Sequence, residues 1–129
     1  MSVSMPPLEH LQVRVPAMPE HTSAGGDIFG GWIMAQVDVA GSVPAVRRSR
    51  GRVVTVAVKE FLFLQPVFVG DMVSIFAWIE GVGTSSMTVV AEVYVERNPH
   101  SPETVQVASA RLVYVAVDDQ GRPRAVEAD

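Results

Sequence analysis

The sequence predicts an α+β fold in which a five-stranded antiparallel sheet wraps around one long central helix. Two observations predict it. Five runs rich in valine and aromatic residues are separated by turn-forming residues, and the segment after the first run is apolar on every side when drawn as a helix. Such a helix must be buried, and a sheet curled around it meets both requirements. At 129 residues the chain has the usual length of one domain, so we expect residues 1–129 to form a single domain, with about seven N-terminal and about five C-terminal residues disordered.

Alternation of apolar and polar residues defines the first predicted strand, in which Leu11, Val13 and Val15 are apolar and Pro16 ends the pattern. Four more strands are predicted after the helix, at residues 52–64, 71–82, 85–97 and 104–118. The third of these has one apolar and one mostly polar face, which is typical of a half-exposed strand. The last is apolar on both faces near residues 112–117, so we expect it at the centre of the sheet or at an interface.

The predicted helix extends from Gly31 to about Ala45 and contains one acid, Asp38, in its apolar surroundings. The helical neighbours of this acid at three- and four-residue spacing are Met34, Ala35, Gly41 and Ser42. None of them is a cation, so an ionised carboxylate here costs several kcal/mol unless it finds partners elsewhere or faces a wet cleft. Two interpretations of Asp38 stay open: a structural carboxylate held by another element or reaching the surface, and a chemical group.

Gly30 and Gly31 favour the chemical interpretation of Asp38. They lie at the expected N-terminus of the helix, where unpaired N–H groups favour negative charge and the missing side chains permit close approach. Gly30 precedes Asp38 by eight residues, a little over two turns, so both lie on roughly the same side of the helix. One site of this kind can polarise a carbonyl and supply a general base or nucleophile. Asp27 just upstream is either part of that site or an N-cap or first-turn acid.

Composition limits the environment and the partners of the chain. Its hydrophobic content of 48% is high for a lone domain, so we expect some apolar surface to meet another subunit. No run approaches the about 20 apolar residues of a membrane helix, and the start MSVSMPPLEH lacks the features of a signal peptide. We therefore expect a cytoplasmic protein that does not bind membranes.

The chain has no cysteine, which excludes disulfides, thiolate metal sites and a cysteine nucleophile. His10, His21 and His100 lack metal-ligand spacing, so no metal is expected. The formal net charge of −4 argues against a general nucleic-acid binder. No G-x-S-x-G motif and no phosphate-binding G-x-x-x-x-G-K-[ST] loop is present.

Arginines are concentrated in two places, although the protein is acidic overall. Of the 10 Lys and Arg residues, four lie in RRSRGR and two in GRPR, namely Arg47, Arg48, Arg50, Arg52, Arg122 and Arg124. Such clusters fit a phosphorylated small molecule, or equally a solvated turn after a helix.

Five segments together resemble the hotdog-fold acyl-CoA thioesterases of the YciA type: AMPEHTS, GGDIFGGWIMAQVD, GRVVTVAV, QPVFVGD and VAVDDQGRPR. They cover most of the chain from about residue 15 to residue 124. The resemblance implies a hotdog fold, two subunits paired into a continuous sheet, and often a trimer of such dimers. It also implies hydrolysis of acyl-CoA to a free acid and coenzyme A, as in fatty acid metabolism, with no cofactor beyond the CoA of the substrate.

The resemblance also implies site residues. Asp38 matches the helix acid that acts as general base or nucleophile, and the N–H groups near Gly30 and Gly31 match those that bind the thioester oxygen. Asp27 matches a residue that shares a site with the helix acid of the partner subunit, and Ser42 matches a hydroxyl that assists the acid in some members.

Contacts with CoA are expected along one strand and at the arginines. The pantetheine is expected along Val54, Thr55, Val56 and Ala57, and the phosphates at Arg52, Arg122 or Arg124, beside the backbone of Gly83, Thr84, Ser85 and Ser86. The chain departs from the family pattern at Ser23 and Gly25, where relatives often carry asparagines, and at Thr84, where they often carry an arginine.

Two other functions stay open. Hotdog dehydratases use a histidine ahead of the helix, which His21 matches in position. Hotdog domains also serve as non-catalytic acyl-CoA sensors, but these usually carry a DNA-binding domain as well, and an acid such as Asp38 is unusual in a tunnel that only binds.

Overall fold

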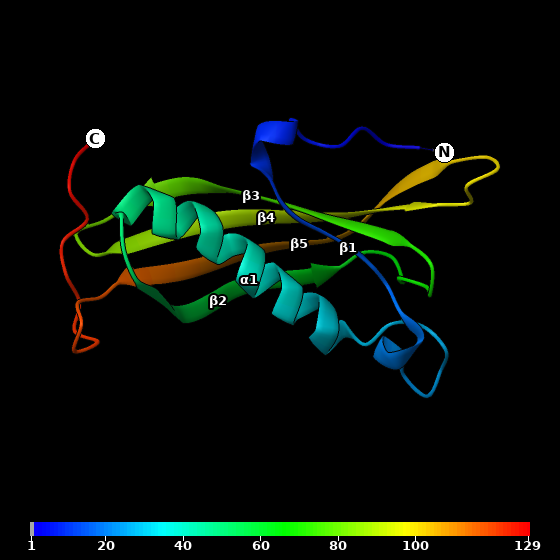
Figure 1. Cartoon of the computed structure of the whole chain (residues 1–129), viewed down its shortest axis with the longest axis horizontal. Helices are drawn as coiled ribbons and strands as arrows, with labels where there is room; N and C mark the ends of the chain where they lie inside the picture. Colours follow the sequence, from blue (N-terminus) through cyan, green and yellow to red (C-terminus); the bar gives the residue numbers. More distant parts are fainter. Residues whose placement is uncertain (1) are drawn as a thin grey trace.

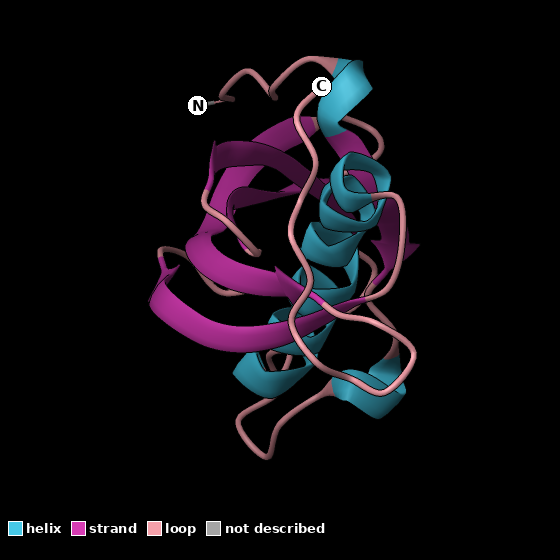
Figure 2. Ribbon diagram, turned by 90° about the vertical axis from the view of Figure 1, so that its left-hand side faces the viewer, coloured by secondary structure: helices cyan, strands magenta, loops and turns pink. Residues whose placement is uncertain are grey.

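The structure, a computed structural model, describes residues 2–129 and has all five predicted strands in one antiparallel sheet (Figure 1). The strands are β1 (Leu11–Pro16), β2 (Val53–Phe63), β3 (Met72–Val82), β4 (Ser86–Arg97) and β5 (Glu103–Ala116). Their order in the sheet is β1-β3-β4-β5-β2. The single long helix α1 (Gly30–Ser49) lies in the hollow of the curled sheet, as Figure 2 shows, and two short 3-10 helices, η1 (Leu8–His10) and η2 (Pro19–His21), flank β1.

Side-chain alternation explains how the sheet covers the helix. In β4 the residues at odd positions, Met87, Val89, Ala91, Val93 and Val95, are fully buried in the core. β5 pairs with β4 on one side and β2 on the other, which confirms the prediction that the doubly apolar strand is central. β2 lies at one edge of the sheet and has a largely exposed surface.

The helix is longer than the sequence predicted. It begins at Gly30 and continues past Ala45 to Ser49, with Pro44 inside it. The N–H of Arg50 donates to the carbonyl of Val46 at 2.8 Å, and Arg50 takes a left-handed conformation with φ of 58°, which ends the helix. The expected end at Ala45 was therefore about one turn short.

The prediction that the helix is buried on every side is wrong within one chain. Ile33, Val37 and Ala40 face the core, but Met34 and Val39 on other sides are 39% and 58% exposed. The sheet covers only part of the helix circumference, and apolar side chains of β2 are exposed as well. The sequence pattern reports that a helix is apolar all round, but it does not distinguish burial by its own sheet from burial by a second subunit.

The two chain ends lie against the domain at several points. The Val3 N–H donates to the Thr104 carbonyl at 3.0 Å, and the Val126 N–H donates to the Thr84 carbonyl at 2.7 Å. The expectations of a single domain and of disordered chain ends stay predictions. Within residues 2–129, no helix combines the length and the apolar character that a membrane span needs.

Candidate active site

Asp38 lies midway along α1, and two hydroxyl groups bind its carboxylate. The Thr55 hydroxyl donates to Asp38 Oδ1 at 2.6 Å, and the Tyr114 hydroxyl lies 3.1 Å from the same oxygen. Tyr114 also donates to the main-chain carbonyl of Asp38 at 2.7 Å. Thr55 on β2 and Tyr114 on β5 are partners in the strand register, which places both hydroxyls at the same point on the helix. The half-buried acid is therefore held by the sheet.

We did not predict Tyr114 as a site residue from the sequence, because it lies within an apolar predicted strand. Its side chain is 1% exposed, and burial, together with the nearby Asp38 carboxylate, raises the pKa of Tyr114 above its usual range. The phenol therefore stays protonated and remains a donor. Gly41 leaves the space that this hydroxyl fills, because a methyl group at Gly41 would overlap it. A glycine on the core side of a helix is the sequence signal that points to such a close approach.

A cleft of about 400 Å³ opens beside Asp38 and is lined mainly by apolar groups. Its lining residues are Gly31, Met34, Ala35, Asp38, Thr55, Val58, Phe61 and Leu112. Gly31 is the second residue of α1, so its N–H has no intrahelical partner. A Cβ added at Gly31 would have no heavy atom within 4 Å, so open space surrounds this position. The cleft thus combines one carboxylate with the positive end of the helix in apolar surroundings.

Gly30 and Asp27 line a second pocket of about 350 Å³, together with residues 63–67. The Ser23 hydroxyl donates to Asp27 Oδ1 at 3.1 Å. Asp27 lies three residues before the helix, and the N-cap residue is Phe29, which makes no side-chain cap. The interpretation of Asp27 as an N-cap or first-turn acid is therefore wrong.

Two other predicted groups make local contacts. The Ser42 hydroxyl donates to the Val39 carbonyl at 2.6 Å, so in this structure its hydrogen bond goes to the helix backbone. His21 Nδ1 accepts from the Met18 N–H at 3.3 Å, and the His21 ring stacks on Trp32 with 4.5 Å between ring centroids. Through these contacts His21 holds the segment before the helix in place, which is a structural role.

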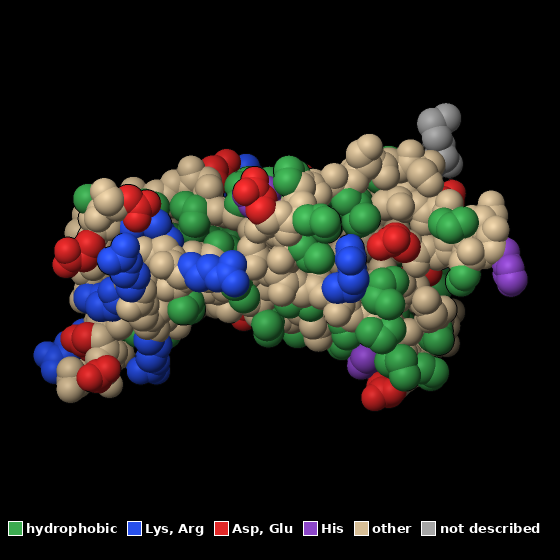
Figure 3. Space-filling view, turned by 45° about the horizontal axis from the view of Figure 1, so that its top comes forward, with side chains coloured by type: hydrophobic (Ala, Val, Ile, Leu, Met, Phe, Trp, Pro, Cys, Tyr) green, Lys and Arg blue, Asp and Glu red, His purple; other side chains and the backbone are tan. Residues whose placement is uncertain are grey.

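The residues expected to contact CoA phosphates gather at one end of the sheet, here called the arginine end. Val117 donates to the Arg52 carbonyl at 3.0 Å, and Ala116 donates to the Ser85 carbonyl at 2.9 Å, so the start of β2, the end of β5 and the β3–β4 hairpin meet. The expected contacts at this end are Arg52, Gly83, Thr84, Ser85, Ser86, Arg122 and Arg124, and Arg47, Arg48 and Arg50 lie at the nearby C-terminus of α1. Figure 3 shows a cluster of blue side chains at this end of the molecule, with a few others elsewhere.

The arginines at this end differ in how they are held. Arg124 donates from Nε to the Val117 carbonyl at 2.9 Å and from Nη1 to the Ser49 carbonyl at 3.0 Å, so it joins the helix C-terminus to the end of β5. Arg48 donates to the Glu127 carbonyl at 2.7 Å. The guanidinium groups of Arg52 and Arg122 are exposed and have no partner within residues 2–129. Arg52 and Arg122 are thus the two expected phosphate contacts with unengaged side chains.

Comparison with known proteins adds to this geometry. The model of the family described as Thioesterase superfamily matches residues 25–100. Acyl-CoA thioester hydrolase YciA of Escherichia coli is 43% identical over 122 residues, which cover 93% of this chain and 92% of that protein. A hexameric hotdog fold thioesterase of Campylobacter jejuni superposes with a TM-score of 0.88 at 35% identity, covering 92% of this chain and 90% of that one.

Two further solved structures carry information on residues or ligands. HI0827, a hexameric broad specificity acyl-coenzyme A thioesterase solved as an aspartate-to-alanine variant, superposes with a TM-score of 0.89 at 41% identity, covering 92% of this chain and 87% of that one. Acyl-CoA hydrolase of Staphylococcus aureus, solved with butyryl coenzyme A and coenzyme A, superposes with a TM-score of 0.82 at 30% identity, covering 91% and 74%. Its alanine variants replace an asparagine, an aspartate 15 residues later and a threonine 17 residues after that.

Proposed function

The chain belongs to the thioesterase superfamily and has the hotdog fold, and from this premise we propose that it hydrolyses acyl-CoA thioesters to a free acid and CoA. The proposed base or nucleophile is Asp38. The observation that carries the proposal is the Asp38 carboxylate, held by the Thr55 hydroxyl in an apolar cleft whose far side is the helix N-terminus. CoA enters and leaves as part of the substrate, so the proposal needs no other cofactor.

Residue spacing supports the choice of Asp38 and Thr55. The intervals of 15 and 17 residues between the altered asparagine, aspartate and threonine of the Staphylococcus aureus enzyme equal those between Ser23, Asp38 and Thr55. The acid and the hydroxyl are the same residue types in both chains. Ser23 is the exception, because a serine stands at the interval of the asparagine.

The hydrogen bonds of Asp38 suit proton abstraction or attack. Both hydroxyls bind Oδ1, and within residues 2–129 nothing donates to Oδ2. As a general base, Oδ2 takes a proton from water, whose oxygen attacks the thioester carbon; the C–S bond then breaks and the proton passes to the CoA sulfur. As a nucleophile, the carboxylate attacks the carbon itself and expels CoA, and water hydrolyses the resulting anhydride. In both routes the oxyanion is held by unpaired N–H groups at a helix N-terminus.

A second subunit completes the proposed site. Gly31 precedes Asp38 by seven residues, about 10 Å along the helix axis, which is too far for one thioester carbonyl to contact both groups of one chain. A partner helix beside the exposed face of α1 would bring its own glycine pair and Asp27 to Asp38. We therefore propose a dimer as the minimal active unit and, like the hexameric relatives, a trimer of dimers.

CoA would extend from Asp38 toward the arginine end. The pantetheine would lie along residues 54–57 of β2. This range includes Thr55, the partner of Asp38, and leads back along the chain to Arg52 at the arginine end. Exposed Arg52 and Arg122 would bind the phosphates, while Arg124 holds the backbone beside them. The cytoplasmic location expected from the sequence stays a prediction.

The test is thiol release from short-, medium- and long-chain acyl-CoAs by the native protein and by Asp38→Asn, with folding checked by circular dichroism. We expect turnover to fall about a hundredfold or more in the folded variant. Asp119→Asn, which alters an exposed aspartate on the turn after β5, is the matched control and should keep its activity.

Two results would overturn the proposal. Unchanged turnover in Asp38→Asn would remove Asp38 from the mechanism. No turnover by the native protein on any chain length, together with tight CoA binding, would support the non-catalytic sensor instead.

A further inference from the structure

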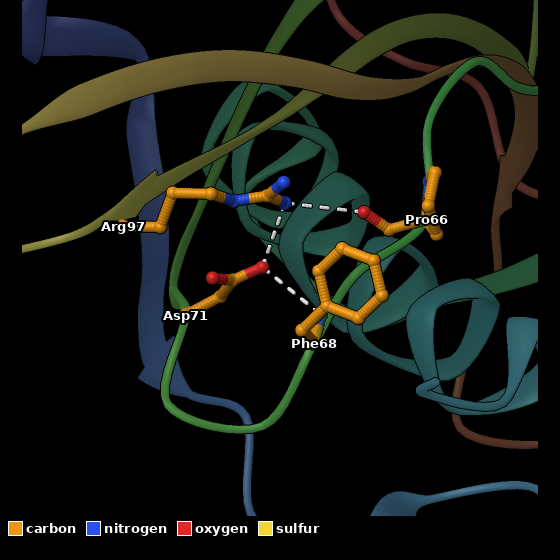
Figure 4. A network of polar contacts seen from close by, with 4 residues as sticks. All are labelled: Pro66, Phe68, Asp71 and Arg97. Atoms are coloured by element: carbon orange, nitrogen blue, oxygen red, sulfur yellow. Dashed lines mark hydrogen bonds and ion pairs between the residues drawn. The ribbon is translucent and has the colours of Figure 1, made fainter. Parts of the chain in front are cut away.

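A buried ion pair lies outside the proposed site, on the loop of residues 64–71 between β2 and β3 (Figure 4). Asp71 Oδ2 accepts from Arg97 Nη2 at 2.8 Å and from the Phe68 N–H at 2.9 Å. The same Arg97 nitrogen donates to the Pro66 carbonyl at 3.1 Å, and the guanidinium lies 5.1 Å from the centre of the Phe68 ring. The Asp71 side chain is 4% exposed and that of Arg97 is 18% exposed.

A gain in folding stability does not account for this buried ion pair. Removing two charges from water costs several kcal/mol, and apolar side chains of similar volume often replace such pairs without loss. Arg97 Nε is also buried without a hydrogen-bond partner within residues 2–129, which adds to the cost. The network has a geometric effect: the pair binds two backbone groups of a single loop, the Pro66 carbonyl and the Phe68 N–H, and Asp71 itself ends that loop.

The fixed loop in turn holds the entry to α1. The Val67 carbonyl, between two of those positions, accepts from the Ile28 N–H at 2.8 Å. Val67 is 1% exposed and Ile28 6% exposed, so the connection is buried in the core. Ile28 lies two residues before Gly30, and Ile28, Gly30 and residues 63–67 face one another across the pocket that contains Asp27. The position of the loop therefore sets the position of the first helical N–H groups.

We propose that Asp71 and Arg97 are positioning residues for the oxyanion-binding end of α1. They act through the loop of residues 64–71 and the Val67–Ile28 hydrogen bond and do not touch the substrate. The inference rests on the proposed function for its effect on catalysis, but the mechanical link from Arg97 to the helix entry can be tested without it.

The first test is the kinetics of Arg97→Met, which keeps much of the side-chain bulk and removes the charge and both donated bonds. We expect kcat to fall about tenfold or more, because small displacements of oxyanion donors are costly. KM for acyl-CoA should change less than twofold. Arg97 ends β4 and Ser86 at the arginine end begins it, so the two lie about 36 Å apart along the strand. Arg97→Lys, which retains a charged donor, should recover part of the lost kcat.

Two controls separate positioning from general loss of stability. Arg111→Met removes an exposed ion pair with Glu80, joined at 2.7 Å between β5 and β3, and should leave kcat unchanged. Ile75→Ala removes buried volume from β3, where its strand partners Val13 and Val93 line neither pocket, and should lower the melting temperature while kcat of the folded protein is maintained. An equal loss of kcat in Ile75→Ala, or an unchanged kcat in folded Arg97→Met, would overturn the inference.

The second test is hydrogen exchange, which does not depend on activity. Arg97→Met should speed amide exchange of Ile28, Phe29 and residues 32–33, whose N–H groups are hydrogen-bonded, by about tenfold or more, whereas the C-terminal half of α1 should exchange at the native rate. Uniform acceleration over the whole helix, or none, would contradict the link. A native protein that lacks turnover but shows the local effect in Arg97→Met would refute the proposed function and leave the link intact.

Discussion

Asp38 is stabilised by two hydroxyls that differ in environment. Tyr114 is buried and bonds both the carboxylate and the main-chain carbonyl of Asp38, whereas Thr55 lies on exposed β2 and bonds the carboxylate alone. The cost of an acid among apolar neighbours identified Asp38 from the sequence, but its partners lie 17 and 76 positions away in the chain. Which distant residues meet a helix depends on strand register and on β-bulges such as the one between Thr55 and Ala57, which the sequence pattern does not specify.

Tyr114→Phe tests the role of the buried hydroxyl. The change removes one bond to Oδ1 and one to the Asp38 carbonyl, so the carboxylate keeps only its bond from Thr55 and its orientation should be less fixed. We expect kcat to fall about tenfold, equivalent to about 1.4 kcal/mol, with a moderate loss of stability. Thiol-release kinetics and thermal unfolding measure the two effects. Tyr94→Phe is the matched control, since Tyr94 also donates to a carboxylate, that of Glu92 at 2.8 Å, but away from the cleft. Equal kcat losses in both variants would contradict a specific role for Tyr114.

Arg122→Ala tests the proposed phosphate contact at the arginine end. The exposed guanidinium should attract phosphate mainly by charge, so its removal should raise KM for acyl-CoA several-fold at low ionic strength and less at high ionic strength. Measuring KM at about 20 mM and about 500 mM salt tests this, because the Debye length falls from about 20 Å to about 4 Å. Arg124→Ala should also lower the melting temperature, since it breaks bonds to Ser49 and Val117. A ratio of variant to native KM that is the same at both salt concentrations would argue against a charge contact.

The sequence predicts a strand or helix well where a single apolar periodicity extends over the whole segment. The five strand boundaries lie within about two residues of those expected, because period-two alternation and turn residues define them locally. The helix end was missed because the apolar pattern stops at Val46, although α1 continues through Arg47 and Arg48 to Ser49. The order of strands in the sheet and the exposure of one side of α1 depend on long-range pairing, and no local pattern encodes them.

Val56→Lys tests whether exposed β2 and α1 form a subunit interface. Val56 on β2 and Val39 on α1 are 55% and 58% exposed, and Val54, Val58 and Leu62 on β2 are exposed as well, which is typical of an interaction surface. A lysine at position 56 should disfavour pairing, so light scattering should detect smaller species. The readout is particle size, because Val56 is also an expected pantetheine contact and its change can lower activity directly. Gln120→Lys places the same charge on the turn after β5 and should not change the size. A full-size assembly in Val56→Lys would place the interface elsewhere.

At the scale of the whole molecule, the two proposed binding functions lie at opposite ends of the sheet. The arginine end concentrates six of the ten cationic residues of a chain whose net charge is −4 (Figure 3). At the other end, the loop held by Asp71 and Arg97 fixes the N-terminus of α1. Asp38 lies between them on the helix, so in the proposed dimer an extended substrate can contact the arginine end and Asp38 of one chain and the helix amides of its partner.

Stability of the whole molecule should fall at alkaline pH because of its two tyrosines. Burial raises the pKa of both Tyr94 and Tyr114, and the carboxylates of Glu92 and Asp38 raise them further. Below about pH 9 both phenols are neutral in the folded and the unfolded chain, so they add no pH dependence. Above that pH the unfolded chain loses these protons while the folded chain retains them. The free energy of unfolding should then fall by up to about 1.4 kcal/mol per pH unit for each tyrosine.

Urea unfolding between pH 8 and pH 11, followed by circular dichroism at one fixed protein concentration, measures this slope, and the fixed concentration removes the effect of assembly. Tyr94→Phe and Tyr114→Phe should each remove about half of the tyrosine contribution, and the double variant should remove nearly all of it. Absorbance of the folded protein should meanwhile reveal no phenolate near pH 10. A double variant that keeps the native slope would assign the alkaline loss to other groups, whereas phenolate formation near pH 10 in folded protein would contradict the burial of both hydroxyls.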